Sequence, residues 1–184
     1  MKRTAISLAV VAAALPVSQA ALADDRGSKG KKASAFAGVC QFSGELRQRP
    51  PLTNTPAAGE ASAHARGRCS GTLTDARGRV RELDRERATY FASAAGELSC
   101  AGGTATGRGF MQIRGERIDF RFSEVRGPGA GVIRLEGEES GSAAGEARAS
   151  ADEDPAEIVE KCGGEGLRRV EIDIDIATTP EISG

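Results

Sequence analysis

The sequence predicts an all-β fold, an antiparallel β-sandwich or barrel of about 8–10 short strands with one short helix near residues 155–161. Segments in which apolar and polar residues alternate recur along the chain, and a period of two is typical of half-buried strands. Glycine is frequent, with 24 residues in 184, and is scattered between these segments. Signals that start and stop a helix occur together in one place. These observations favour an antiparallel sheet over a helical fold.

The clearest alternation lies at residues 170–176, where valine and isoleucine point to one side and acidic residues to the other. Residues 118–122 and 132–135 alternate in a similar way. Turn compositions at 75–78 and 126–129 are expected to join neighbouring strands as hairpins. Further strands are expected at residues 38–47, 65–74, 97–101, 105–113 and 142–149.

The expected helix is marked at both ends. Asp154 is suited to the N-cap, Pro155 to the first helical position, and Glu157 follows three residues after the cap. Two glycines at 163–164 are expected to end the helix. Residues 79–92 fit either a helix or a strand, and we interpret them as a strand.

The N-terminal residues 1–23 have the composition of a signal peptide. A positively charged start is followed by an uncharged, largely apolar run and by small residues that place the cleavage after Ala23, with Ala20 as a second acceptable point. The run is shorter than the ~20 apolar residues of a membrane-spanning helix and is interrupted by Pro16. We therefore expect export without membrane insertion, then a disordered lead-in over 24–35 and a single β domain over 36–184.

Four cysteines follow the predicted signal peptide, at positions 40, 69, 100 and 162. An even number in an oxidising compartment predicts two disulfides. Of the three possible pairings, the similar contexts VCQFSGEL and RCSGTLTD favour Cys40 with Cys69, which leaves Cys100 with Cys162. The bridges would reinforce a core that has no Trp, one Tyr and six Phe to fill it.

No residue pattern predicts a catalytic site. The single histidine, His64, lies in a polar stretch and is expected at the surface, so a serine or cysteine nucleophile has no evident base. Acidic clusters at 136–139, 152–154 and 171–175 could supply the two carboxylates of a hydrolase or oxygen ligands for Ca²⁺. Solvated strand faces and helix capping already explain most of these residues. We therefore expect no catalytic residue, no metal site and no cofactor.

Residues 47–60, with the sequence RQRPPLTNTPAAGE, are predicted to form an exposed loop that proline keeps extended and the first disulfide holds at its base. Such a preorganised loop suits a protease inhibitor or another binding protein, and a plain connector is the alternative interpretation. The candidate binding residues within it are Arg49, Pro50, Pro51 and Leu52.

Together these features predict a secreted, disulfide-stabilised β domain, a non-enzymatic binding or envelope-associated protein with an extracellular or cell-envelope partner. The net charge of −1 argues against nucleic acid as that partner. A composition rich in arginine, alanine and glycine is typical of a GC-rich bacterial genome. The alternatives are a protease inhibitor acting through residues 47–60 and a carboxylate-based hydrolase.

Overall fold

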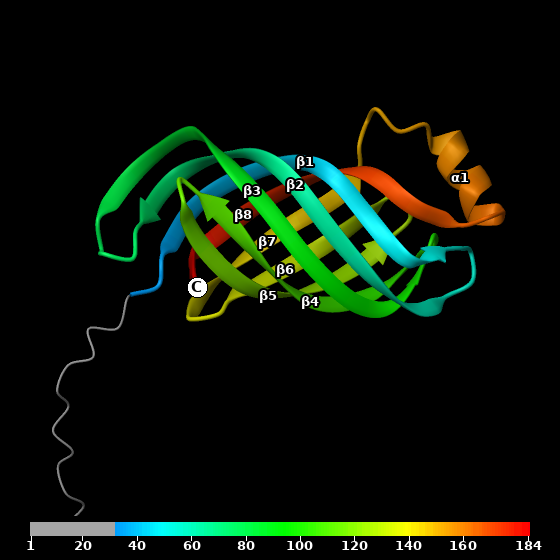
Figure 1. Cartoon of the computed structure of the whole chain (residues 1–184), viewed down its shortest axis with the longest axis horizontal. Helices are drawn as coiled ribbons and strands as arrows, with labels where there is room; N and C mark the ends of the chain where they lie inside the picture. The colour runs from blue at the N-terminus through cyan, green and yellow to red at the C-terminus, as the bar shows by residue number, and fades with distance from the viewer. Residues whose placement is uncertain (1–31) are drawn as a thin grey trace, which may run out of the picture. The chain divides into compact units, whose positions relative to one another are not determined.

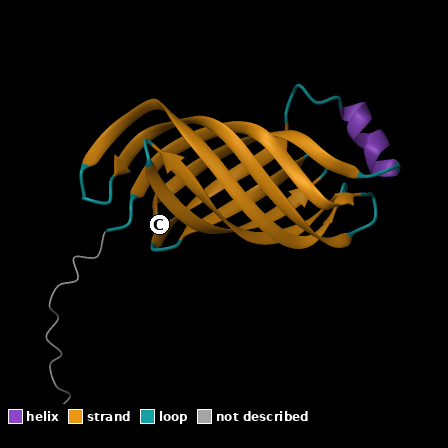
Figure 2. Cartoon of the chain, in the orientation of Figure 1, coloured by secondary structure: helices purple, strands orange, loops and turns teal. Residues whose placement is uncertain are grey.

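Eight antiparallel strands close into a barrel in the computed structural model, which describes residues 32–184 (Figure 1). The strands follow one another around the barrel in chain order, and β1 pairs with β8 to close it. One helix, α1 (Pro155–Gly163), lies between the last two strands (Figure 2, purple). The strands are β1 (Ala35–Leu52), β2 (Ala57–Thr74), β3 (Val80–Ser99), β4 (Gly102–Ile113), β5 (Glu116–Gly127), β6 (Ala130–Gly137), β7 (Ser140–Ala149) and β8 (Leu167–Ser183).

The predicted all-β class is confirmed, and of the two architectures it allowed, the barrel is the one found. The first three strands are longer than predicted, at 18 to 20 residues each. The predicted strand at 97–101 is not separate, because it continues the strand predicted at 79–92 as the single strand β3. At Gly96 the backbone of β4 lies close to β3, since a Cβ atom there would lie 2.0 Å from the carbonyl oxygen of Thr104.

The helix and both hairpin turns form where predicted. The Asp154 carboxylate accepts a hydrogen bond from the backbone N–H of Ala156 at 2.9 Å, as an N-cap does. The turn after β2 contains Gly78, and the turn after β5 contains Gly129, both with the positive φ that glycine tolerates best. Short-range signals in the sequence therefore determine these connections.

The start of the fold differs slightly from the predicted boundary. The predicted signal peptide, residues 1–23, and most of the predicted lead-in lie outside the described residues. The end of the lead-in belongs to the barrel, because Ser34 is buried and its hydroxyl donates a hydrogen bond to Glu116 Oε2 at 2.6 Å. Strand β1 begins at Ala35, one residue before the predicted domain.

Both predicted disulfides are present, Cys40–Cys69 and Cys100–Cys162. Cys40 and Cys69 face each other directly in the register of β1 and β2. The second bridge joins the turn after β3 to helix α1. Two disulfides indicate an oxidising, extracellular environment.

The two ends of the barrel are built differently. The end that carries α1, the segment 53–56 and the turns at 100–101 and 128–129 is called here the mouth end; the opposite end, with the β2–β3 hairpin, is called the closed end (Figure 1). Inward positions near the closed end carry large apolar side chains that are almost fully buried. They are Phe36, Leu73, Met111, Ile113, Ile118, Leu135 and Ile182.

An aromatic layer separates this packed half from the mouth half. The ring centroids of Phe42 and Tyr90 lie 5.5 Å apart, and those of Tyr90 and Phe120 lie 5.6 Å apart. Beyond this layer the inward side chains are small, because β2, β3 and β7 carry alanines at these positions. These alanines are Ala61, Ala63, Ala92, Ala94, Ala147 and Ala149.

Candidate functional site

A pocket of about 130 Å³ occupies the mouth half of the barrel. Its innermost part is formed by Tyr90, Phe122 and Ile174, and its sides are formed largely by the inward alanines. Ile158 and Cys162 of α1 complete the lining at the mouth end. An eight-stranded barrel is just wide enough for side chains to fill its interior, or for one small ligand when they do not. The small inward residues therefore account for the pocket.

One ion pair is built into this apolar lining. Glu124 and Arg126 lie two residues apart on β5, on the inward face that also carries Phe122. The guanidinium donates from Nε to Glu124 Oε1 and from Nη2 to Glu124 Oε2, both at 3.0 Å. Their side chains are only 8% (Glu124) and 12% (Arg126) exposed, so this two-point contact is largely removed from solvent.

A glycine on the neighbouring strand leaves room for the carboxylate. Gly131 on β6 is buried and lies opposite Arg126 in the β5–β6 register. A Cβ atom at this position would lie 2.6 Å from Glu124 Oε1 and would push the carboxylate away. The geometry of the ion pair thus depends on the absence of a side chain at residue 131.

Tyr90 adds a third polar group to the pocket. Its ring is held between Phe42 and Phe120, and the residue is buried. Burial raises the pKa of the Tyr90 hydroxyl, and the negative charge of Glu124 raises it further. The hydroxyl therefore remains a neutral hydrogen-bond donor. Tyr90 is also the only tyrosine in a chain without tryptophan.

Helix α1 is attached to the barrel mainly through one residue. Cys162 is the buried side chain of the helix, and it is bonded to Cys100 in the turn after β3. The backbone N–H of Cys100 also donates to the carbonyl oxygen of Thr53 at 2.8 Å, which links the turn to the segment after β1. The second disulfide therefore fixes α1 beside the pocket.

A buried amide lies in the same half of the barrel. Gln48 is 6% exposed, faces inward on β1 between Leu46 and Leu52, and pairs in register with Ala61. Its side-chain oxygen and nitrogen both lack a hydrogen-bond partner among the described residues. A buried amide without partners lowers the stability of the folded state.

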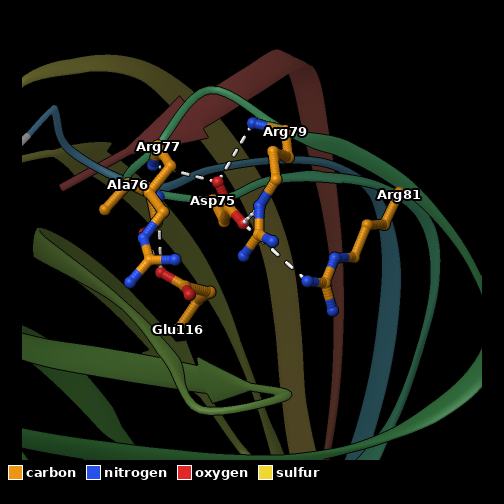
Figure 3. A network of polar contacts seen from close by, with 7 residues as sticks. Asp75, Ala76, Arg77, Arg79, Arg81 and Glu116 are labelled. Atoms are coloured by element: carbon orange, nitrogen blue, oxygen red, sulfur yellow. Dashed lines mark hydrogen bonds and ion pairs between the residues drawn. The ribbon is translucent and has the colours of Figure 1, made fainter.

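The closed end carries a separate polar network, which has a structural role (Figure 3). Asp75 Oδ1 accepts hydrogen bonds from the backbone N–H groups of Arg77 at 2.9 Å and Arg79 at 3.0 Å. The Arg79 side chain donates from Nε to Asp75 Oδ2 at 2.7 Å. These contacts, led by the backbone N–H of Arg79, lower the pKa of Asp75. The carboxylate thus holds the β2–β3 turn.

The predicted loop at 47–60 is wrong over most of its length. Strand β1 continues to Leu52 and β2 begins at Ala57, so the connection consists of residues 53–56 only. Pro50 and Pro51 are accommodated within β1 because they fall in a register shift between β1 and β8, where no regular ladder bond is required. Of the four candidate binding residues, Arg49 and Pro50 are exposed, Pro51 is half-buried and Leu52 lines the pocket.

The other candidates for chemistry lie away from the pocket. His64 is exposed on β2, as predicted. The described part of the chain contains no cluster of three or more residues suited to hold a metal ion. Glu124 is the one carboxylate among the pocket-lining residues of the described barrel, and Arg126 already binds it. The pocket therefore lacks the pair of carboxylates that a glycosidase-type hydrolase requires.

The pocket, the ion pair and the role of Tyr90 were not predicted from the sequence. Two signals were present. Alanine alternates with larger polar residues in ASAHA at 61–65, and the inward series of Ile118, Phe120 and Phe122 continues into Glu124 and Arg126. If the same alternation is extended by four residues, the side chains of Glu124 and Arg126 fall on the inward face of the barrel.

Fold and pocket together define a closed, eight-stranded, up-and-down antiparallel barrel with a hollow mouth half. Comparison of the chain with protein families, with curated proteins and with solved structures finds no match. In residues 32–184, no helix is long and apolar enough to span a membrane.

Proposed function

We propose that this protein is an exported binding protein that holds a small, mainly apolar molecule inside the mouth half of its barrel. The observation that carries the proposal is the alanine-lined pocket of about 130 Å³, which contains a buried Glu124–Arg126 pair. Ligand sites are typically concave, mostly apolar and equipped with a few fixed polar groups. An engineered apolar cavity of about 150 Å³ holds benzene, so the pocket suits a ligand of similar size.

Binding without catalysis fits the lining. The single histidine lies on the outer surface and all four cysteines are in disulfides, so neither supplies a base or a nucleophile to the pocket. Export through residues 1–23, with cleavage after Ala23 and release outside a bacterial cell, is part of the proposal and is consistent with the disulfides. The connection 53–56 is too short to be the extended loop on which the protease-inhibitor alternative relied.

The test uses Tyr90 as a reporter, because the chain has no other tyrosine and no tryptophan. Cyclopentane is added to the purified protein, and tyrosine fluorescence is followed. Ala94→Leu fills the pocket, whereas Ala95→Leu adds the same atoms to the exposed face of β3 next to it. We expect a saturable change in the wild type and in Ala95→Leu, and none in Ala94→Leu. Absence of a saturable change in the wild type, or an equal change in Ala94→Leu, would contradict the proposal.

Export is tested by the intact mass of the protein recovered from the culture medium of the source cells, before and after reduction and alkylation. A chain that begins at Asp24 and accepts alkyl groups only after reduction supports it. A retained leader argues against it.

A further inference from the structure

The charge balance of the pocket limits the charge of its ligand. Glu124 and Arg126 neutralise each other, and both line the pocket. Arg148, the other cation in the lining, is exposed and bound by Asp175 at 2.7 Å. An anionic ligand would therefore lie beside the Glu124 carboxylate in surroundings of low polarity, where repulsion between like charges is strong. A cationic ligand would meet the same difficulty at Arg126. The balanced pair favours an uncharged ligand.

The hydrogen-bonding groups of the pocket are mainly donors. The contact with Glu124 uses the Nε–H group of Arg126 and one N–H of its Nη2. Nη2 lies 3.0 Å from both oxygens of Glu124, whereas the two N–H groups of Nη1 make no hydrogen bond to the described residues. The Tyr90 hydroxyl supplies another donor, while each Glu124 oxygen already accepts a hydrogen bond. The complementary group on a ligand is a hydrogen-bond acceptor.

The rest of the lining offers hydrocarbon contact. The inward alanines, Phe122, Ile133 and Ile174 present no hydrogen-bonding side chain, so a polar group of the ligand that lies against them would lose its water without replacement. A pocket of about 130 Å³ also restricts the ligand to the size of one small ring or a short chain.

We infer that the ligand is an uncharged molecule of about benzene size, with a hydrocarbon part and one carbonyl or similar acceptor group. The free N–H groups of Arg126 bind this acceptor. This inference rests on the proposed function and names the ligand class for the same pocket. Arg126 recognises the acceptor, Glu124 holds the guanidinium in place and excludes acids, and the alanines receive the hydrocarbon part.

The first experiment compares three ligands on the full mature protein by calorimetry near neutral pH. They are cyclopentane, cyclopentyl methyl ketone, and cyclopentanecarboxylate, in which an anionic oxygen replaces the methyl group of the ketone. We expect the ketone to bind at least about tenfold more tightly than cyclopentane, as a hydrogen bond to a charged donor provides. We expect the carboxylate to bind at least about tenfold more weakly than the ketone.

The outcomes separate the inference from the proposed function. If cyclopentane binds but the ketone binds no better, or if the carboxylate matches the ketone, the ligand class is wrong and the proposed function stands. If none of the three binds, the proposed function fails together with the inference.

A charge variant provides a second test. Glu124→Gln removes the negative charge, so the affinity for cyclopentanecarboxylate should rise at least about tenfold relative to the ketone. The control is Glu136→Gln on the exposed face of β6, which should leave the ratio unchanged. An unchanged ratio in a folded Glu124→Gln protein would overturn the role of Glu124. If that variant does not fold, the comparison in the wild type decides on its own.

Discussion

Replacing one member of the buried Glu124–Arg126 pair is expected to destabilise the barrel more than replacing both. In Glu124→Leu the guanidinium keeps its charge at a site where its side chain is 12% exposed, and in Arg126→Met the carboxylate is left at a site where it is 8% exposed. Removing one partner of a buried ion pair costs about 3–5 kcal/mol, because the other charge is then uncompensated. For a domain of this size, such a loss lowers the melting temperature by roughly 10 °C.

The double variant Glu124→Leu with Arg126→Met places hydrocarbon in a lining that is already apolar. Apolar replacement of a whole buried ion pair is commonly neutral or stabilising, so we expect a stability within about 1 kcal/mol of the wild type or above it. The coupling energy between the two sites should then exceed about 3 kcal/mol.

The assay is urea unfolding followed by far-ultraviolet circular dichroism for the wild type, both single variants and the double variant. Arg121→Met is the control, because Arg121 lies on the outer face of the same strand and binds Glu138 at 3.2 Å in an exposed pair. It should change the midpoint little. The idea that the interior pair is a desolvated unit is refuted if the loss of stability in the double variant equals the sum of the losses in the two single variants. It is also refuted if each single variant loses as little stability as Arg121→Met.

Three further predictions concern other parts of the barrel. Replacing both Cys100 and Cys162 with serine removes a bridge that spans 62 residues, and the chain-entropy model predicts a loss of stability of about 4 kcal/mol, measured by thermal unfolding. Helix α1 is then held less firmly beside the pocket, so ligand release should be faster in stopped-flow kinetics. Gln48→Leu removes two buried polar atoms without partners and should raise stability by about 1–3 kcal/mol, read from the urea midpoint. The lowered pKa of Asp75 implies stabilisation that is complete above about pH 4 and lost as the pH falls through that pKa. The urea midpoint of Asp75→Asn should therefore lie below that of the wild type near neutral pH and approach it in acid.

Local signals in the sequence were sufficient for the fold class, the helix and both disulfides. Alternation in strands depends on neighbouring residues alone, and so does helix capping at Asp154. The pairing of Cys40 with Cys69 followed from their similar contexts, and the structure shows why: the two residues sit opposite each other in adjacent strands. The strand and helix signals need no knowledge of distant contacts, and the disulfide pairing required only a comparison of the sequences around the cysteines.

Features that depend on distant contacts were not predictable in this way. Closure of the barrel requires β1 to pair with β8, and no local pattern specifies this. The prolines at 50 and 51 indicated a loop, but their place in a register shift allowed them to stay within a strand. The pocket arises because inward alanines of β2, β3 and β7 meet at one end, and their common position becomes visible only when the strands are paired.

The order of the strands also has a consequence for how the chain folds. Every strand pair except one joins neighbours in sequence, so hairpins can form from contacts that are close along the chain. The remaining pair, β1 with β8, joins residues as far apart as Ala35 and Ser183. Its loop-closure entropy has to be overcome before its contacts can form, which places closure of the β1–β8 seam last. Until then the meander exposes two unpaired edges, so the open barrel is the species most prone to aggregate with other copies of the chain.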